Sequence, residues 1–157
     1  MKTIKDQFDL HTRLFNNVLE NISDSDAGER LNEKINHLKW LAGHVTNVRL
    51  SFLKLVGETE DTSLDEFFSH GKSINADVKY PTIEVIKEKW VNASDKVESA
   101  LMNIPERVLA SNPPVDVPFG DKTMKGFLGF LMHHEAYHIG QMGILRKYLG
   151  NKAMSYK

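Results

Sequence analysis

The sequence of 157 residues contains no cysteine. It can therefore form neither a disulfide framework nor a zinc–thiolate site, and it offers no thiol nucleophile of its own. An excess of charge of one sign is also missing, because 20 Lys and Arg residues stand against 21 Asp and Glu residues. Nucleic-acid binders usually carry a basic surface that replaces phosphate counterions. The composition therefore argues against nucleic acid and against an anionic membrane surface as partners.

Long hydrophobic runs are absent as well. No stretch approaches the roughly 18 consecutive apolar residues of a membrane-spanning helix, and the N-terminus MKTIKDQFDLH lacks the apolar core of a signal peptide. Together with the lack of cysteine, this predicts a cytoplasmic protein that does not enter a membrane. The length predicts one domain, residues 1–157, in which folding buries roughly 68–70% of the surface of the unfolded chain.

Apolar residues recur at alternating steps of three and four in four segments, which is the spacing of one face of a helix. Thr82, directly after Pro81, is expected to cap the third helix, and Pro105 stops it. Gly57 ends the second helix, and Gly150 is the expected C-terminal cap of the fourth. The predicted helices span residues 4–22, 33–56, 82–104 and 123–149.

Two long connections separate these helices. Residues 58–81 are polar, with a short helix expected at 63–68, and residues 106–122 cannot be helical throughout because they include Pro113, Pro114 and Pro118. Alternation of period two, the sign of a half-buried strand, is missing over any useful length. The predicted fold class is therefore all-α, a four-helix bundle with long connections between helices two and three and between helices three and four.

Two histidines, His134 and His138, stand four residues apart in the last predicted helix. Side chains at this spacing lie on one face, about 6 Å apart, where two imidazoles can bind one ion at Zn–N distances of about 2.0–2.1 Å. Both fall on the stripe expected to pack inward, with Leu131, Leu145 and Tyr148. The alternative is a pair of core histidines satisfied by hydrogen bonds.

The pair supplies half a site, and His44 is the natural third ligand because it lies midway along the second helix, beside the apolar face. Three histidines with open positions are a catalytic arrangement, whereas closed sites with four ligands are structural. His11, on the apolar face of the first helix, is either a pocket residue near the site or an ordinary core residue. The remaining histidines are expected at the surface or in loops: His37, His70 and His133.

With these residues the sequence resembles the DinB-like family, whose members are regarded as metalloenzymes. The resemblance rests on His44 after the run Trp-Leu-Ala-Gly, on His134-x-x-x-His138-x-Gly140-Gln141 near the C-terminus, and on the order of helices along nearly the whole chain. It implies a four-helix bundle, often dimeric, with a three-histidine site for Zn²⁺, Ni²⁺ or a similar ion. Some relatives are thiol S-transferases that use a small cellular thiol, and many have no assigned reaction.

Two other metal motifs overlap this segment. His134-Glu135-Ala136-Tyr137-His138 matches the zincin pattern H-E-x-x-H, in which the glutamate is the general base of a protease, but no glutamate follows as a third ligand and the metzincin extension is missing. Glu135-x-x-His138 also matches half of a di-iron carboxylate site, which needs a second copy of the motif. No second copy occurs in the sequence, so neither interpretation is favoured.

The function predicted from these observations is activation of a small-molecule nucleophile by one divalent ion bound to His44, His134 and His138. Zn²⁺ is the first choice, and imidazole ligands also suit Ni²⁺ and Fe²⁺. Because coordination lowers the pKa of a bound thiol or water, the expected reaction is transfer of a low-molecular-weight thiol to a small electrophilic substrate, with a preference for thiol that comes from the resemblance alone. The alternatives are a metal-dependent hydrolase of a small molecule and a non-catalytic metal-binding structural or interaction bundle.

Three residues are candidates for supporting or catalytic roles in this site, namely Gln141, Glu135 and His11. Gln141 follows His138 by three residues on the same face of the helix and is expected to orient a ligand or substrate. An oxygen of Glu135 is expected to accept a proton from a neighbouring histidine ligand. The connections 58–81 and 106–122 are expected to shape the mouth of the pocket, because long loops in compact domains are often functional.

Overall fold

The computed structural model describes residues 1–69, 71–118 and 120–156, and every regular element in that part of the chain is a helix. Three helices, α2, α4 and α6, are single turns spanning Asp24–Ala27, Asp65–Phe68 and Glu106–Leu109. The other four correspond to the predicted amphipathic segments and are α1 (Lys2–Val18), α3 (Leu38–Leu55), α5 (Ile83–Asn103) and α7 (Met124–Tyr148). The prediction of an all-helical fold is confirmed.

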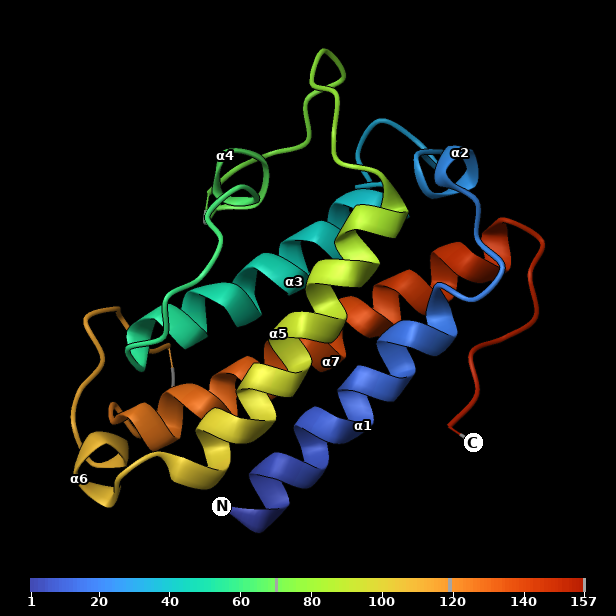
Figure 1. The fold of residues 1–157 in the computed structure, drawn as a ribbon. Helices are drawn as coiled ribbons and strands as arrows, with labels where there is room; N and C mark the ends of the chain where they lie inside the picture. Colours follow the sequence, from blue (N-terminus) through green and yellow to red (C-terminus); the bar gives the residue numbers. More distant parts are fainter. Residues whose placement is uncertain (70, 119, 157) are drawn as a thin grey trace.

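The four long helices pack around one apolar core (Figure 1). Helix α3 contacts α5, α5 contacts α1, α1 contacts α7, and α7 contacts α3, so each long helix has two long neighbours. At the centre the rings of Phe15 and Trp90 stack with centroids 4.0 Å apart, and both side chains are fully buried. Burial of such large apolar surfaces is the main favourable term in folding. In the described part of the chain, no helix is both long and apolar enough to cross a membrane.

Helix α7 buries part of the stripe predicted for it, including Leu131 and Leu145. Arg146 is buried in its last turn and donates hydrogen bonds to the carbonyl oxygens of Val18, the last residue of α1, and of Glu20, just beyond it. Tyr148, predicted to face inward, is instead 53% exposed, because Arg146 holds the inward position in this turn. The residues that α7 buries along its length include Leu128, Leu131, Glu135, Ile139, Met142 and Leu145.

Helix α3 begins at Leu38 rather than near residue 33, because the side chain of His37 caps it. The backbone N–H of Trp40 donates to His37 Nδ1 over 2.8 Å, which satisfies one of the N–H groups that a helix start leaves without a partner. His37 lies in the loop before α3 and is only 7% exposed, so of the two predicted places, surface or loop, the loop is correct. Burial and, less strongly, the positive charges of Lys39 and Arg30 lower the pKa of His37 to about 4.

The His37 cap is expected to make the protein sensitive to mild acid. An unfolded histidine takes up a proton below its ordinary pKa of about 6.5, whereas folded His37 stays neutral down to about 4. The contribution of His37 to stability is therefore complete above pH 6.5 and is lost as the pH falls towards 4, by about 2 kcal/mol at pH 5. Asparagine also caps helices but does not titrate, so His37→Asn should remove this part of the loss. Urea unfolding at pH 7 and pH 5 measures the difference, and equal losses in both proteins would contradict it.

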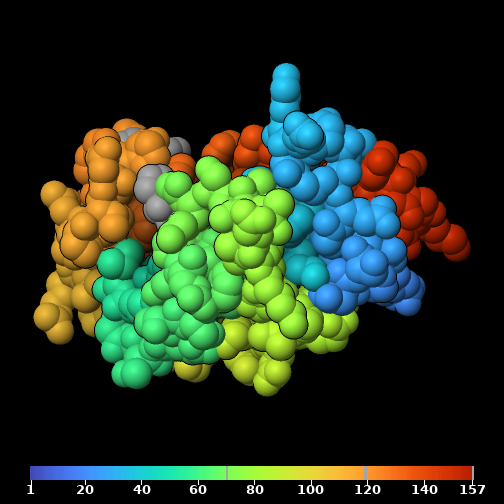
Figure 2. Space-filling model, turned by 90° about the horizontal axis from the view of Figure 1, so that it is seen from above, coloured from blue at the N-terminus to red at the C-terminus, as the bar shows by residue number. Residues whose placement is uncertain are grey.

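Helices α2 and α4 and the segments around them lie along one side of the bundle, which is the upper side in Figure 1, whereas α6 lies at the lower left. Seen from above, the residues before α3 (blue), the segment around α4 (green) and the connection from α6 to α7 (orange) cover this face (Figure 2). The short helix expected at 63–68 is confirmed as α4. Helix α2 lies between the first two predicted helices, where no helix was expected, and the Oγ of Ser23 caps it by accepting from the N–H of Asp26.

Candidate metal centre

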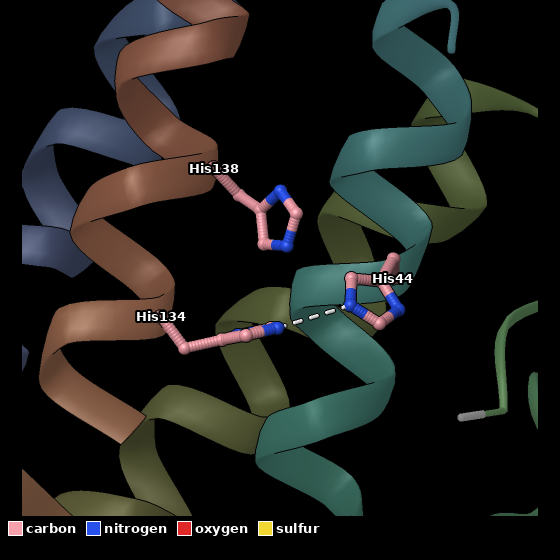
Figure 3. A group of neighbouring side chains, drawn as sticks. All are labelled: His44, His134 and His138. Atoms are coloured by element: carbon pink, nitrogen blue, oxygen red, sulfur yellow. Dashed lines mark hydrogen bonds between the residues drawn. The ribbon is translucent and has the colours of Figure 1, made fainter. Parts of the chain in front are cut away.

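Helices α3 and α7 bring three histidine rings together. His44 projects from the middle of α3 towards His134 and His138, which stand one turn apart on α7 (Figure 3). The Nε2 atoms of His44 and His134 are 3.1 Å apart. One ring nitrogen from each histidine belongs to a set of atoms that all lie within 4.8 Å of one another. A single ion can therefore be reached from all three side chains after small rotations of the rings.

The outer nitrogens of two of these rings face oxygen acceptors. His44 Nδ1 lies 3.2 Å from the carbonyl oxygen of Phe68, and His138 Nδ1 lies 2.8 Å from Oε1 of Gln141. With a proton on each Nδ1, both contacts are hydrogen bonds, and the lone pair of each Nε2 is left for another partner. Metal-bound histidines usually donate their second N–H to an oxygen in this way. Gln141 therefore lies where the sequence analysis expected a residue that orients a ligand.

The third ring, His134, has a different environment. Its Nδ1 is buried and has no hydrogen-bond partner among the described residues, and such a group carries a desolvation cost. Burial and, less strongly, the neighbouring His138 and His44 lower the pKa of His134 to about 4. Burial also lowers the pKa of His138. Both rings are therefore neutral at pH 7, which is the protonation state that binds a metal.

These observations fit a divalent ion. Without an ion, the Nε2–H of His134 could donate to Nε2 of His44, as in an ordinary core pair. A cation would use the lone pairs of all three rings at once, and it explains why His44 and His138 both have acceptors at Nδ1. Within the described residues, the group of ligand-type side chains contains these three and no carboxylate. Three neutral imidazoles suit Zn²⁺, Ni²⁺ or Fe²⁺ better than hard ions such as Mg²⁺.

Aromatic side chains form one wall of the site. The ring of Trp40 stacks on that of His44 with centroids 5.1 Å apart and an interplanar angle of 13°. The buried ring of Phe68 meets Trp40 edge-on at 6.2 Å and stacks on Tyr80 at 5.6 Å. Phe68 therefore has two roles, because its ring packs on this wall while its carbonyl faces His44. This contact supports the expectation that the connection 58–81 shapes the site.

Gly43 makes the close approach of Phe68 possible. A Cβ at position 43 would lie 2.2 Å from Cζ of Phe68, far inside van der Waals contact. Gly43→Ala is expected to push the Phe68 ring aside and to destabilise the protein by about 1–2 kcal/mol, because overpacking costs about 1–3 kcal/mol and the gain in helix propensity offsets up to about 1 kcal/mol. Affinity for metal should fall as well, since the Phe68 carbonyl moves away from His44. Urea unfolding and metal titration measure the two effects.

Gly140→Ala is the matched control, because Gly140 is also inside a long helix but a Cβ added there would meet nothing within 4 Å. The free energy of unfolding of this variant should rise by up to about 1 kcal/mol, because alanine has a higher helix propensity than glycine. If Gly43→Ala were as stable as Gly140→Ala and bound metal normally, the close contact with Phe68 would have no consequence.

Glu135 points away from the site and is buried in the core, with 1% of its surface exposed. Its Oε1 accepts from Nε of Arg49 over 2.6 Å, and its Oε2 accepts from Nη2 of Arg49 over 2.9 Å. His11 Nδ1 lies 3.0 Å from Oε2. Burial alone would raise the pKa of Glu135, but Arg49 and His11 outweigh this effect and lower it. Glu135 is thus an ionised, paired core residue.

This arrangement bears on two sequence-based interpretations. A zincin needs its glutamate beside the metal and a water, whereas Glu135 is turned inward and bound to Arg49 and His11. The described contacts of Glu135 also do not include a hydrogen bond to His134 or His138. Among the described contacts His11 pairs with Glu135 and not with the three histidines. The structure therefore brings His44, His134, His138 and Gln141 together and leaves Glu135 and His11 in the core.

Arg49 is a buried cation that was not predicted from the sequence. Besides Glu135, its guanidinium donates to Oγ of Ser94, to Oγ1 of Thr12 and to the carbonyl oxygen of Phe8, and it lies 3.7 Å from the ring centroid of Trp90. Its position could have been found from the spacing, because Arg49 follows Val45 by four residues and precedes Phe52 by three and therefore lies on the apolar face of its helix. A cation on such a face requires a buried partner.

The three other histidines predicted at the surface or in loops are not part of the site as described. His133 is exposed, as predicted, and is not part of the three-histidine group. His37 is the buried cap of α3 described above. His70 lies outside the described residues.

Known proteins share the family profile and the fold of this chain. The profile of the DinB superfamily matches residues 7–142. A DinB-like protein from Bacillus subtilis superposes with a TM-score of 0.69 at 17% identity, over 98% of this chain and 96% of that one. A conserved protein from Enterococcus faecalis superposes with a TM-score of 0.72 at 15% identity, over 96% and 97% of the two chains. At these identities the two structures show the shared fold alone. A search of curated proteins gave no match. Because the profile covers most of the sequence, the chain belongs to the DinB superfamily.

Proposed function

We propose that His44, His134 and His138 bind one divalent ion, with Zn²⁺ as the first choice, and that the four long helices act as a bundle that holds this centre. The observation that carries the proposal is the pairing of the outer nitrogens, since Nδ1 of His44 faces a carbonyl and Nδ1 of His138 faces an amide oxygen. These contacts orient two Nε2 lone pairs towards the space shared with His134.

The reaction that we propose is transfer of a low-molecular-weight thiol to a small electrophilic molecule. When bound, a divalent ion lowers the pKa of a coordinated thiol or water, so that the anion forms at neutral pH. The chain has no cysteine to serve as the nucleophile. In the reaction a C–S bond forms, the bond from that carbon to its leaving group breaks, and the proton of the thiol passes to solvent or to the leaving group.

The residues of the chain contribute position and environment. The hydrogen bonds from His44 and His138 fix the two rings, and the Trp40 ring, stacked on His44, keeps water from that side of the site. Neutral His134 and His138 do not repel a cation. The group contains three histidines and no carboxylate in the described part of the chain, a set that leaves coordination positions for a substrate.

The proposal is tested with protein loaded with Zn²⁺, Ni²⁺ or Fe²⁺ and a panel of cellular thiols and alkyl or aryl electrophiles. Thioether formation should depend on metal, saturate with one of the thiols and be lost in His44→Ala. His133→Ala is the matched control, because His133 is an exposed histidine next to the site and should leave the rate unchanged. Metal-dependent ester or amide hydrolysis without thiol transfer would replace the transferase with a hydrolase. No turnover with a tightly held ion would indicate a structural metal.

A further inference from the structure

We propose a binding pocket for the substrate beside the metal centre, and we infer that it takes a small amphiphilic anion, with an apolar body and one carboxylate-like or sulfonate-like group. This inference rests on the proposed function, since it identifies the class of molecule that the centre would act on. The pocket is a cavity of about 280 Å³ between the segment 31–36 and the facing sides of α3 and α7. Its lining consists of Leu31, Lys34, Ile35, Asn36, Leu41, Gln141, Ile144 and Leu145.

The pocket adjoins the three histidines. Leu41 precedes His44 by three residues on α3, and Gln141 follows His138 by three residues on α7, so both helices place the pocket about one turn from the rings, a rise of roughly 5 Å. Gln141 belongs to both places, because its Oε1 accepts from Nδ1 of His138 while its side chain lines the cavity. A molecule in the pocket would therefore contact the residue that orients a ligand.

The walls of the pocket are mainly apolar. Leu41 and Leu145 are 2% and 4% exposed and belong to the core, whereas Ile35 and Ile144 are 37% and 67% exposed at the rim. Apolar walls with a few placed polar groups are typical of small-molecule sites, and this volume is near the lower end of their range of about 300–1,000 Å³. A short hydrocarbon or aromatic body would cover the exposed side chains of Ile35 and Ile144.

The polar groups of the pocket favour a negative charge. Lys34 lines it and is exposed, and the described residues place no carboxylate within 4 Å of its ammonium group. Among the described residues the lining includes no acidic side chain, and its other polar side chains are the amides of Asn36 and Gln141. Tyr137 holds the amide group of Gln141 by accepting from Nε2 over 3.1 Å. An anionic group on the ligand can thus pair with Lys34.

The test measures binding, not turnover. Hexanesulfonate, neutral hexanol and hexyltrimethylammonium are titrated into the metal-loaded protein, and amide shifts are followed by ¹H–¹⁵N NMR. Hexanesulfonate should shift residues 31–36 and 141–145 and bind more tightly than the other two probes. Lys34→Gln should weaken its binding about three- to five-fold, the range of a partly exposed ion pair. Lys34→Arg should restore binding, Ile144→Asp should abolish it, and the control Lys147→Gln, on the exposed side of α7, should not change it.

Three results would overturn the inference. Equal binding of the three probes would remove the preference for an anion. Shifts confined to residues 130–138 would place the ligand at the histidines and not in this pocket. A stable dimer whose interface includes exposed Tyr137 and Ile144 would mean that a second copy of the chain covers the pocket. Since hexanesulfonate has no electrophilic carbon and sulfonates are weak metal ligands, a failure to detect thiol transfer leaves this measurement unaffected.

Discussion

His134→Ala and His138→Ala are each expected to lower the affinity for the divalent ion by more than about 100-fold. Loss of an outer hydrogen-bond partner of a ligand alone costs about 10–100-fold, and here a ligand itself is removed from a set of three. Purification without a polyhistidine tag, followed by metal analysis by mass spectrometry, should find about one ion per wild-type chain and almost none in either variant.

Two variants make this result specific. His133→Ala removes an exposed histidine directly beside His134 and should keep the metal content of the wild type. Gln141→Ala removes the acceptor of His138 Nδ1. Its affinity for the metal should lie between those of the wild type and the histidine-ligand variants, about 10–100-fold below the wild type. If His134→Ala and His138→Ala kept the metal of the wild type, the three histidines would not be its ligands.

Arg49→Met is expected to destabilise the fold by about 3–5 kcal/mol, the typical cost of removing one partner of a buried ion pair. Both Arg49 and Glu135 have 1% of their surface exposed, so the remaining carboxylate would have no water to replace the lost hydrogen bonds. The free energy of unfolding from urea titration at pH 7 measures the loss.

A second substitution separates buried charge from lost packing. The double variant Arg49→Met, Glu135→Met has neither charge. It should be more stable than Arg49→Met alone, because apolar residues can replace a buried pair at little cost. The control is Lys54→Met, which breaks the half-exposed pair with Asp65 and should cost less than about 1 kcal/mol. If Arg49→Met cost no more than Lys54→Met, the buried pair would contribute little.

The sequence predicted the four long helices well because their hydrophobic spacing is regular and several residues that begin or end a helix are clear. Thr82 caps α5, as expected, and Gly150, with a φ of 81°, follows α7. The start of α3 was missed because histidine is an unusual helix cap, so that nothing in residues 33–37 marked His37 as the boundary. The single-turn helices α2 and α6 were not predicted, whereas α4, of the same length, was.

The part of the candidate site that depends on spacing within one helix was predicted, and the part that depends on packing between helices was harder to predict. His134 and His138 stand four residues apart, and a helix brings such residues together whatever the rest of the fold does. Placing His44 beside them depends on how α3 packs against α7, which the order of helices and the resemblance suggested. The direction of Glu135 could not be read from its own helix, because it depends on Arg49, 86 residues earlier in the chain.

The contacts of Arg49 also restrict how the chain can assemble. This one guanidinium binds Phe8 and Thr12 of α1, Ser94 of α5 and Glu135 of α7, so its hydrogen bonds are complete only when all four long helices are in place. A state with one of these helices detached would hold a charged group in a poorly hydrated interior with some of its partners missing. Partly assembled states are therefore high in free energy, and folding should approach a single cooperative transition in which the metal-binding residues of α3 and α7 come together with the rest of the core.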